Sequence, residues 1–209
     1  MTIEALYQLD STQAVQRLLC RPALDLLMQA LSTAGEGWAL VLIALGLALK
    51  VSRDRRQALR SGLRGVAILA ATGAIVVVTK RLVQAPRPLQ LLGAEHVRVL
   101  LEPLRLMSFP SGHSAAAAAL AAWAWREPSA GPRLWPWLFA FLVGVSRVYV
   151  GAHWVTDVVA GWLMGIAVAA VVCRAWPRPV AAGAAPAAAP AGPAGALARA
   201  EGGEGDSWR

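Results

Sequence analysis

The chain has 209 residues, enough for one domain, and its apolar fraction of 57% with only 15% charged residues departs from the composition of soluble globular proteins. A mean hydropathy of +0.51 indicates a protein that lies largely within a lipid bilayer. The formal net charge of +8 would suggest nucleic-acid binding in a soluble chain. Here the cations lie in short gaps between apolar runs, so they exclude a nucleic-acid partner and indicate membrane topology and anionic lipid headgroups.

The N-terminal stretch over residues 18–33 mixes leucines with Arg21, Asp25 and Gln29. This mixture predicts an amphipathic helix at the membrane interface rather than a full span. Residues 1–17 lack a basic start followed by an apolar run, so no cleavable signal peptide is expected. The two cysteines lie far apart and predict neither a metal site nor a disulfide framework.

Apolar runs then recur along the chain, and they cover residues 37–51, 63–79, 114–125, 134–150 and 154–173. Several are shorter than the roughly 20 residues that a straight span needs, so burial in a bundle or a thinner local bilayer must accommodate them. Tryptophans lie near the ends of most runs, as in an interfacial belt. The sequence therefore predicts an all-α integral membrane bundle of about five to six transmembrane helices, five being favoured, with an N-terminal amphipathic helix.

Basic residues predict the orientation of these spans. Residues 50–64 hold six cations, residues 126–133 hold two, and Arg174 and Arg178 follow the last run. The positive-inside rule puts these three segments in the cytoplasm. Residues 80–109 and 147–153 then face outward, away from the cytoplasm. Residues 80–109 are also basic, which a functional need for cations there would explain.

Residues 177–209 consist mostly of alanine, proline and glycine. Such a segment cannot bury enough apolar surface to offset the entropy cost of ordering it. We therefore expect a transmembrane domain over residues 1–176 and a disordered cytoplasmic tail over residues 177–209.

His153 and Asp157 are four residues apart in an apolar run, so they share one face of a helix. The carboxylate can accept a hydrogen bond from one imidazole nitrogen and leave the other free to attack. Arg147 lies just upstream, and a charge beside a span faces a cavity or a partner. A structural pair with a snorkelling arginine is the alternative.

Two further groups fall at the outward ends of runs. Ser111, Gly112 and His113 precede an alanine-rich helix, whose N-terminal amides favour an anion, although a simple helix cap would look the same. Lys80 and Arg87 flank a short outward segment and could grip a phosphoryl group or merely snorkel. Together the three groups suit phosphoryl transfer, and since neither a carboxylate cluster nor a metal-ligand set accompanies them, we expect no metal and no cofactor.

The three groups resemble the signature of the type-2 phosphatidic acid phosphatase superfamily. Its first part is a lysine, six residues and Arg-Pro; its second is Pro-Ser-Gly-His; its third is Ser-Arg, five residues, His, three residues and Asp. Every position is filled in order, and the resemblance covers residues 24–173. The matching residues are Lys80, Arg87, Pro88, Pro110, Ser111, Gly112, His113, Ser146, Arg147, His153 and Asp157.

The resemblance implies a metal-independent membrane lipid phosphatase with an extracytoplasmic site. His153 would be the nucleophile that forms a phosphohistidine, Asp157 would orient it, and His113 would be the general acid and then the general base. The phosphoryl oxygens would be held by the remaining signature residues, which are Lys80, Arg87, Ser111, Gly112 and Arg147.

The resemblance leaves the lipid phosphate open. Undecaprenyl pyrophosphate, phosphatidylglycerophosphate, phosphatidic acid and lipid A phosphates are all candidates. Residues 88–109 would shape the choice, and their polar side chains either touch a second phosphate or are ordinary surface residues; these are Glu95, His96, Arg98 and Arg105.

Two other functional classes stay open, and so does the oligomeric state. A vanadate-dependent haloperoxidase shares the signature, but those enzymes are soluble and larger. A non-catalytic scaffold or transporter would be favoured by degraded motifs, and none is degraded here. Gly161 and Gly165 form a Gly-x-x-x-Gly pattern that can pack helices closely, so a homodimer is possible, although chance would also produce the pattern.

Overall fold

The computed structural model describes residues 12–52, 54–100, 107–127 and 134–177. Within these ranges the chain is helical and contains no strand, as the sequence predicts. The helices in chain order are α2 (Thr12–Leu19), the 3-10 turn η1 (Pro22–Leu24), α3 (Asp25–Ala34), α4 (Gly37–Val51), α5 (Arg55–Val83), α6 (Pro88–Leu92), α7 (Gly112–Trp125), α8 (Trp135–Tyr149) and α9 (Val155–Ala175).

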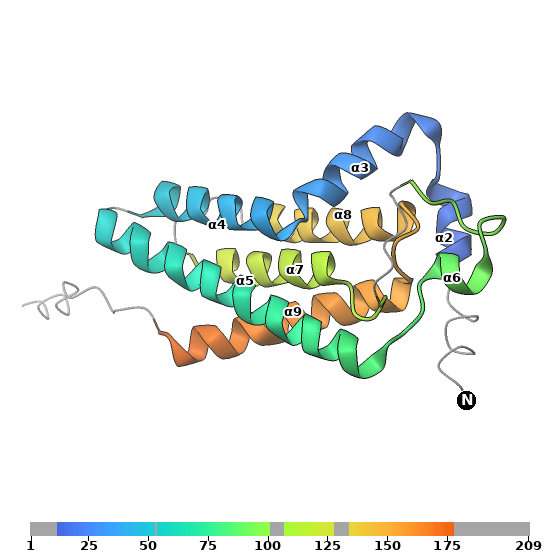
Figure 1. The fold of residues 1–209 in the computed structure, drawn as a ribbon. Helices are drawn as coiled ribbons and strands as arrows, with labels where there is room; N and C mark the ends of the chain where they lie inside the picture. The colour runs from blue at the N-terminus through green and yellow to red at the C-terminus, as the bar shows by residue number, and fades with distance from the viewer. Residues whose placement is uncertain (1–11, 53, 101–106, 128–133, 178–209) are drawn as a thin grey trace, which may run out of the picture. The chain divides into compact units, whose positions relative to one another are not determined.

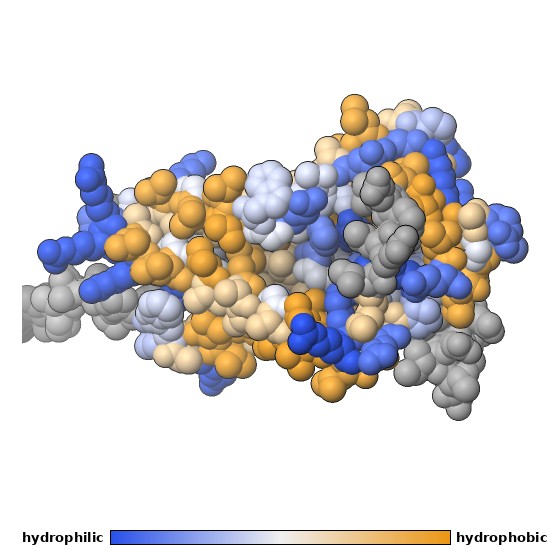
Figure 2. Space-filling model, in the orientation of Figure 1, coloured by the Kyte–Doolittle hydropathy of each residue, from blue (hydrophilic) through white to orange (hydrophobic). Residues whose placement is uncertain are grey.

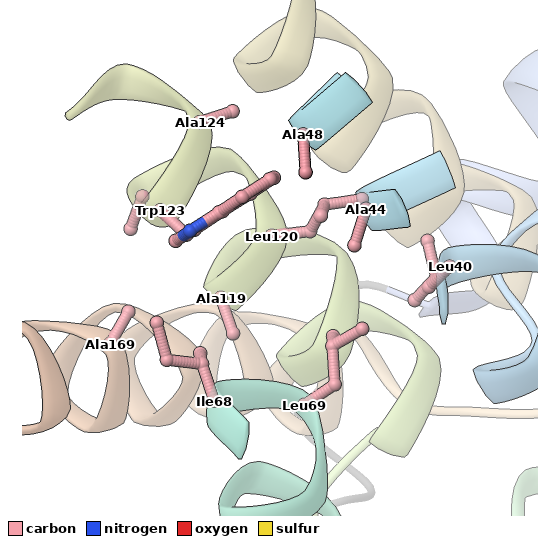
Figure 3. Close-up of a cluster of buried hydrophobic side chains, with 11 residues drawn as sticks. Leu40, Ala44, Ala48, Ile68, Leu69, Ala119, Leu120, Trp123, Ala124 and Ala169 are labelled. Atoms are coloured by element: carbon pink, nitrogen blue, oxygen red, sulfur yellow. The ribbon is translucent and has the colours of Figure 1, made fainter. Parts of the chain in front are cut away.

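Helix α7 lies among α4, α5, α8 and α9 and forms the core of the bundle (Figure 1). Its alanines are almost all buried, because the small side chains let the neighbouring helices approach closely. Trp123 fills the space beside them and packs with Ala44, Ala48 and Ile68, as Figure 3 shows. The alanine-rich run thus serves close helix packing at the centre of the fold.

The outer surface of the bundle is apolar. Large exposed hydrophobic side chains occur on α4, α5, α8 and α9, and examples are Leu42, Val78, Phe141 and Leu163. Figure 2 shows them gathered along the helices, with hydrophilic residues concentrated toward the two ends. A surface of this kind fits a lipid environment and would be unfavourable in water.

Length and hydropathy qualify two segments of the described chain as membrane spans, Arg55–Leu92 and Val155–Ala175. A third is possible if Pro22–Ala34 and Gly37–Lys50, which are bent by 72° relative to each other, form one broken span. Helices α7 and α8 have only 14 and 15 residues. The expectation of five to six spans is therefore not established by the helices alone.

The N-terminal region differs from the single helix expected over residues 18–33. Pro22 follows the end of α2 and begins η1, and the chain then enters α3. A proline disfavours helical conformation in the residue before it, here Arg21, which is extended. The stretch is therefore divided into two helices, and its amphipathic interfacial character stays a prediction.

The segment 50–64 is also different from the expected loop. Helix α5 already begins at Arg55, where Asp54 caps it by accepting a hydrogen bond from the backbone N–H of Gln57 at 2.7 Å. Arg64 is buried and forms an ion pair with Glu127, which follows α7. The apolar run predicted too late a start for this helix, at residue 63, because arginines interrupt the hydropathy there, although arginine is a good helix former.

The expected disordered tail begins at the edge of the described residues. Trp176 and Pro177 are the last of them, and residues 178–209 lie outside the part of the chain that the structure describes. The tail therefore stays a prediction.

Candidate active site

His153 lies in the turn between α8 and α9, and Asp157 lies in the first turn of α9. The His153 Nδ1 is 3.3 Å from Asp157 Oδ2. Asp157 Oδ2 also accepts hydrogen bonds from the backbone N–H of Trp154, at 3.0 Å, and from the hydroxyl of Ser108. An ionised carboxylate only accepts, so this contact assigns the proton of neutral His153 to Nδ1 and leaves Nε2 unprotonated.

The surroundings of His153 favour its neutral form. The side chain is buried, with 2% of its surface exposed. Burial, together with the positive charges of Arg147, Arg87 and Lys80, holds the pKa of His153 well below its usual range. At neutral pH the free imidazole nitrogen is therefore available as a nucleophile.

Lys80 joins the last turn of α5 to the segment that leads into α7. Its Nζ donates to the backbone carbonyls of Met107 at 2.6 Å and Ser108 at 2.9 Å. An ammonium group has three hydrogens, so these two bonds leave one for a ligand. The lysine thus combines a structural contact with a free charge at the same end of the bundle as His153.

Arg87 caps the start of α6 and reaches the turn that carries His153. Its guanidinium Nη1 donates to the carbonyl of Ala152 at 2.5 Å, directly before the histidine. Its backbone N–H donates to Gln90 Oε1 at 2.8 Å, which closes the first turn of α6. The guanidinium is therefore held beside the nucleophile candidate by its bond to Ala152.

Arg147 lies in the last turn of α8 and is 2% exposed. Its Nη1 donates to the hydroxyl of Ser32 on α3. Its Nε is buried and has no hydrogen-bond partner among the described residues. An unpaired buried donor costs free energy, so a group that accepts from this nitrogen would be bound favourably.

Ser111, Gly112 and His113 form the N-terminus of α7. Ser111 is the N-cap, and its backbone N–H donates to the carbonyl of Asp157 at 3.0 Å. Among the described residues, a Cβ atom added to Gly112 would touch only Val76, at 3.5 Å, so packing against them does not explain this glycine. His113 lies beside Gly35, at the bend between α3 and α4.

The structure brings together all three groups that the sequence singles out. Ser108 forms hydrogen bonds with both Lys80 and Asp157. Arg87 donates to the carbonyl of Ala152, the residue before His153. The backbone N–H of His153 donates to the carbonyl of Arg147 at 3.2 Å. Side chains separated by more than 70 residues therefore share one end of the bundle, and the assembled set can bind an anion beside a neutral histidine.

The polar side chains of the outer loop take other positions. Arg98 pairs with Asp25 of α3 through two hydrogen bonds of 2.9 and 2.6 Å. His96 is exposed, and its Nδ1 lies 3.0 Å from the carbonyl of Leu92 and 3.3 Å from the carboxylate of Glu95. Arg105 lies outside the described residues. The guanidinium of Arg98 already binds Asp25 of α3, which argues against a contact between Arg98 and a second phosphate.

Sequence reasoning missed several residues that support the site. Ser108 contacts Asp157, Ser32 contacts Arg147, and Gln16 of α2 donates to the carbonyls of Val148 at 3.0 Å and Arg98 at 3.1 Å. None belongs to the signature, and isolated serines or glutamines carry no pattern that would mark them.

Gly161 and Gly165 face α7 of the same chain. A Cβ at Gly161 would lie 2.6 Å from the carbonyl oxygen of Ser111, and one at Gly165 would lie 2.0 Å from that of Ala115. The Gly-x-x-x-Gly pattern therefore serves intramolecular packing of α9 on α7. A homodimer stays a prediction that this pattern no longer supports.

The chain matches the family described as the PAP2 superfamily over residues 62–180, which is more than half of its length. It belongs to that superfamily. The match includes all three signature groups, so the family expected from the sequence is confirmed. Among the described residues of this PAP2 chain, no three histidine, cysteine or carboxylate side chains cluster as metal ligands would.

Named relatives and a solved structure agree with this membership. The chain is 34% identical over 76% of its length to the decaprenylphosphoryl-5-phosphoribose phosphatase of Mycobacterium tuberculosis, of which it covers 85%. It is 45% identical over 32% of its length to the undecaprenyl-diphosphatase of Sulfolobus acidocaldarius, and it spans only 32% of that relative.

The solved structure is that of a transmembrane PAP2 type phosphatidylglycerolphosphate phosphatase from Bacillus subtilis, at 25% identity and a TM-score of 0.65. The alignment covers 80% of this chain and 84% of the other. With the apolar helices described above, this similarity shows an integral membrane protein.

Proposed function

We propose that this PAP2 protein is a metal-independent lipid phosphatase that hydrolyses a phosphomonoester or a pyrophosphate through a phosphohistidine intermediate. The observation that supports this proposal most directly is the His153–Asp157 pair. It is buried, it fixes the Nδ1–H tautomer, and its free nitrogen lies at the end of the bundle where Lys80, Arg87 and Arg147 gather.

In the first step, His153 Nε2 attacks the phosphorus, and the bond from phosphorus to the leaving oxygen breaks as the new P–N bond forms. His113 donates a proton to the leaving oxygen. The bound phosphate brings negative charge beside His113 and so favours its protonated form. Asp157 stabilises the imidazolium that develops at His153.

In the second step, His113 accepts a proton from water, which attacks the phosphorus while the P–N bond breaks. Inorganic phosphate and neutral His153 are the products. Lys80, Arg87, Ser111, Gly112 and Arg147 hold the three equatorial oxygens in both steps, where negative charge is greatest in the transition state. The open Nε of Arg147 and the amide groups at the start of α7 support this role.

The substrate class follows from the membrane setting. The candidate site lies at one end of a bundle whose outer surface is apolar. The lipid tail of the substrate would therefore stay in the bilayer while its phosphate reaches the site. Two of the relatives named above carry the names of polyprenyl-lipid phosphatases, an undecaprenyl-diphosphatase and a decaprenylphosphoryl-5-phosphoribose phosphatase. Undecaprenyl pyrophosphate is therefore our first candidate, ahead of phosphatidylglycerophosphate, phosphatidic acid and lipid A phosphates.

The proposed setting is the inner membrane of a bacterium, with about five to six spans and the site on the extracytoplasmic side. The arginine-rich start of α5 lies at the opposite end of that helix from Lys80, which supports this orientation. The short helices α7 and α8 would cross with the others, because α7 is enclosed by the bundle and α8 packs along α7 and α9.

Substitution of the proposed nucleophile tests the function. We expect His153→Ala to lower phosphate release from undecaprenyl pyrophosphate by at least about 1,000-fold, because no other group takes its place in the attack. Release is measured on the purified full-length protein in detergent, with EDTA present throughout. Phosphatidylglycerophosphate, phosphatidic acid and lipid A are assayed in parallel.

The matched control is His96→Ala, which removes an exposed histidine of the outer loop and should retain activity within about twofold. Full activity of the His153→Ala protein would overturn the nucleophile assignment. A wild-type protein that releases no phosphate from any of the four lipids would overturn the proposed function itself.

A further inference from the structure

Ser108 lies just before the Pro-Ser-Gly-His segment and belongs to none of the signature groups. It is fully buried, with 0% of its surface exposed. Three different atoms of this residue make hydrogen bonds: the hydroxyl bonds Asp157, and the backbone N–H and carbonyl both bond the segment that begins at Lys80. That combination calls for a role beyond filling space.

The side chain contacts the catalytic pair. Its hydroxyl donates to Asp157 Oδ2 and lies 3.5 Å from His153 Nδ1. Because the hydroxyl has a single proton, donating it to the carboxylate leaves only oxygen lone pairs toward the imidazole. A lone pair there favours the Nδ1–H tautomer and opposes the other one.

The backbone of Ser108 contacts the cationic segment. Its N–H donates to the carbonyl of Ala85 at 2.9 Å, and its carbonyl accepts from Lys80 Nζ at 2.9 Å. The same residue thus sets the position of a phosphate-binding lysine and of the carboxylate that orients the nucleophile.

We propose that Ser108 is a positioning residue that fixes His153 in its Nδ1–H tautomer through Asp157 and aligns this pair with Lys80. The inference rests on the proposed function for its effect on rate, but its effect on the tautomer does not depend on activity. Without the hydroxyl, Asp157 keeps the backbone N–H of Trp154 and the imidazole as partners. The carboxylate then loses one of these three donors, so its contact with Nδ1 is less firmly fixed and the Nε2–H tautomer becomes accessible.

The charged and titratable groups around His153 must stay the same in any comparison. They come from every element packed against the site, and they are Asp157, Arg147, Arg87, Lys80 and His113. A substitution at Ser108 changes none of them, so a difference between variants reports on the hydroxyl group.

The test compares Ser108→Ala, Ser108→Cys and Ser108→Thr in the full-length protein. We expect Ser108→Ala and Ser108→Cys to lower kcat by about 10-fold with KM unchanged, and Ser108→Thr to restore most of the rate because it keeps the hydroxyl. Ser61→Ala is the matched control: Ser61 is buried in α5, its hydroxyl has no partner among the described residues, and it lies about 28 Å along the helix from Lys80.

Histidine ¹⁵N NMR gives a second measurement that needs no turnover. The chain has only three histidines, so His153 is assigned with His96→Gln and His113→Gln proteins. The wild-type protein should show the Nδ1–H tautomer alone, and Ser108→Ala should show a mixture of both tautomers.

A Ser108→Ala protein with the wild-type kcat and a single Nδ1–H tautomer would overturn the inference. Lower activity accompanied only by a lower melting temperature, with the tautomer unchanged, would assign Ser108 a merely structural role and overturn it as well. If the wild-type protein proves inactive on all four lipids, the proposed function fails, while the NMR comparison still decides the role of Ser108.

Discussion

At His153, burial and charge act in the same direction on the imidazole. Both disfavour the imidazolium form, since a buried cation loses hydration and three further cations repel it. Asp157 accepts from Nδ1 and so fixes which nitrogen carries the proton of the neutral ring. The balance leaves a neutral nucleophile in a pocket of positive charge, where an incoming phosphate meets no competing proton on Nε2.

The lowered pKa of His153 leads to a pH prediction. The folded protein binds a proton at this residue only well below pH 6.5, the usual value, so His153 should stay neutral at pH 6. Its ¹⁵N resonances in the unliganded protein measure this directly, and kcat/KM should not decline from loss of the nucleophile until the pH is below about 6.5.

The lowered pKa of His153 also makes the stability of the folded protein depend on pH. The unfolded chain takes up this proton near pH 6.5 while the folded chain does not, so the contribution of His153 to the free energy of unfolding is full above that pH and is lost as the pH falls below it. An imidazolium signal for His153 at pH 6 or above would contradict the prediction.

Among the helices, the contact of α9 with α7 places the two histidine-bearing segments against each other. The backbone carbonyl of Ser111 approaches Gly161, and that of Ala115 approaches Gly165. Side chains larger than hydrogen would hold the helices apart at these points. The glycines therefore determine the separation between the N-terminus of α7, with His113, and the first turn of α9, with Asp157.

Enlarging one of these glycines should destabilise the fold. Gly165→Ala puts a Cβ 2.0 Å from the Ala115 oxygen, and such overpacking typically lowers the free energy of unfolding by about 1–3 kcal/mol. We expect a lower melting temperature in detergent and a lower kcat. Gly73→Ala is the control, because an added Cβ on this α5 glycine meets nothing within 4 Å in the part of the chain that the structure describes.

Helix propensity alone would make the control neutral or slightly stabilising. If the Gly165→Ala and Gly73→Ala proteins melt at the same temperature and show the same activity, α7 and α9 do not pack closely at Gly165.

At the scale of the whole molecule, the cations at the two ends of α5 differ in their exposure to solvent. At the beginning, Arg55, Arg56 and Arg60 are exposed, whereas Lys80 near the other end is half-buried in the site. Exposed arginines suit the anionic cytoplasmic surface of a membrane, while the lysine serves a ligand. The distribution predicts that the site faces away from the cytoplasm.

Cysteine labelling tests this orientation. In a protein carrying Cys20→Ser and Cys173→Ser, we introduce either Glu95→Cys in the outer loop or Arg56→Cys at the start of α5, both at exposed positions. A membrane-impermeant thiol reagent should label the first in intact cells with a permeabilised outer envelope, and the second only after the inner membrane is disrupted. The reverse pattern would place the site in the cytoplasm.

The sequence by itself determined the helical membrane class, the PAP2 family and the identity of the signature residues. It could do so because hydropathy is a local property, and because the spacing of His153 and Asp157 on one helix needs no tertiary information. It erred where local signals conflict, as at Arg55–Arg64, where charge hides a continuing helix, and around Pro22, which divides the N-terminal stretch.

Only the tertiary structure decided how the signature is held in place. Ser108, Ser32 and Gln16 contact the site from segments that lie about 45 to 130 residues away in the chain, and serine or glutamine has no periodicity that reveals such a contact. The same holds for Gly161 and Gly165. Their Gly-x-x-x-Gly pattern could pack against a helix of the same chain or of a second copy, and the structure identifies that helix as α7. Burial and hydrogen-bond partners arise from long-range packing, and for that reason they could be found only in the folded chain.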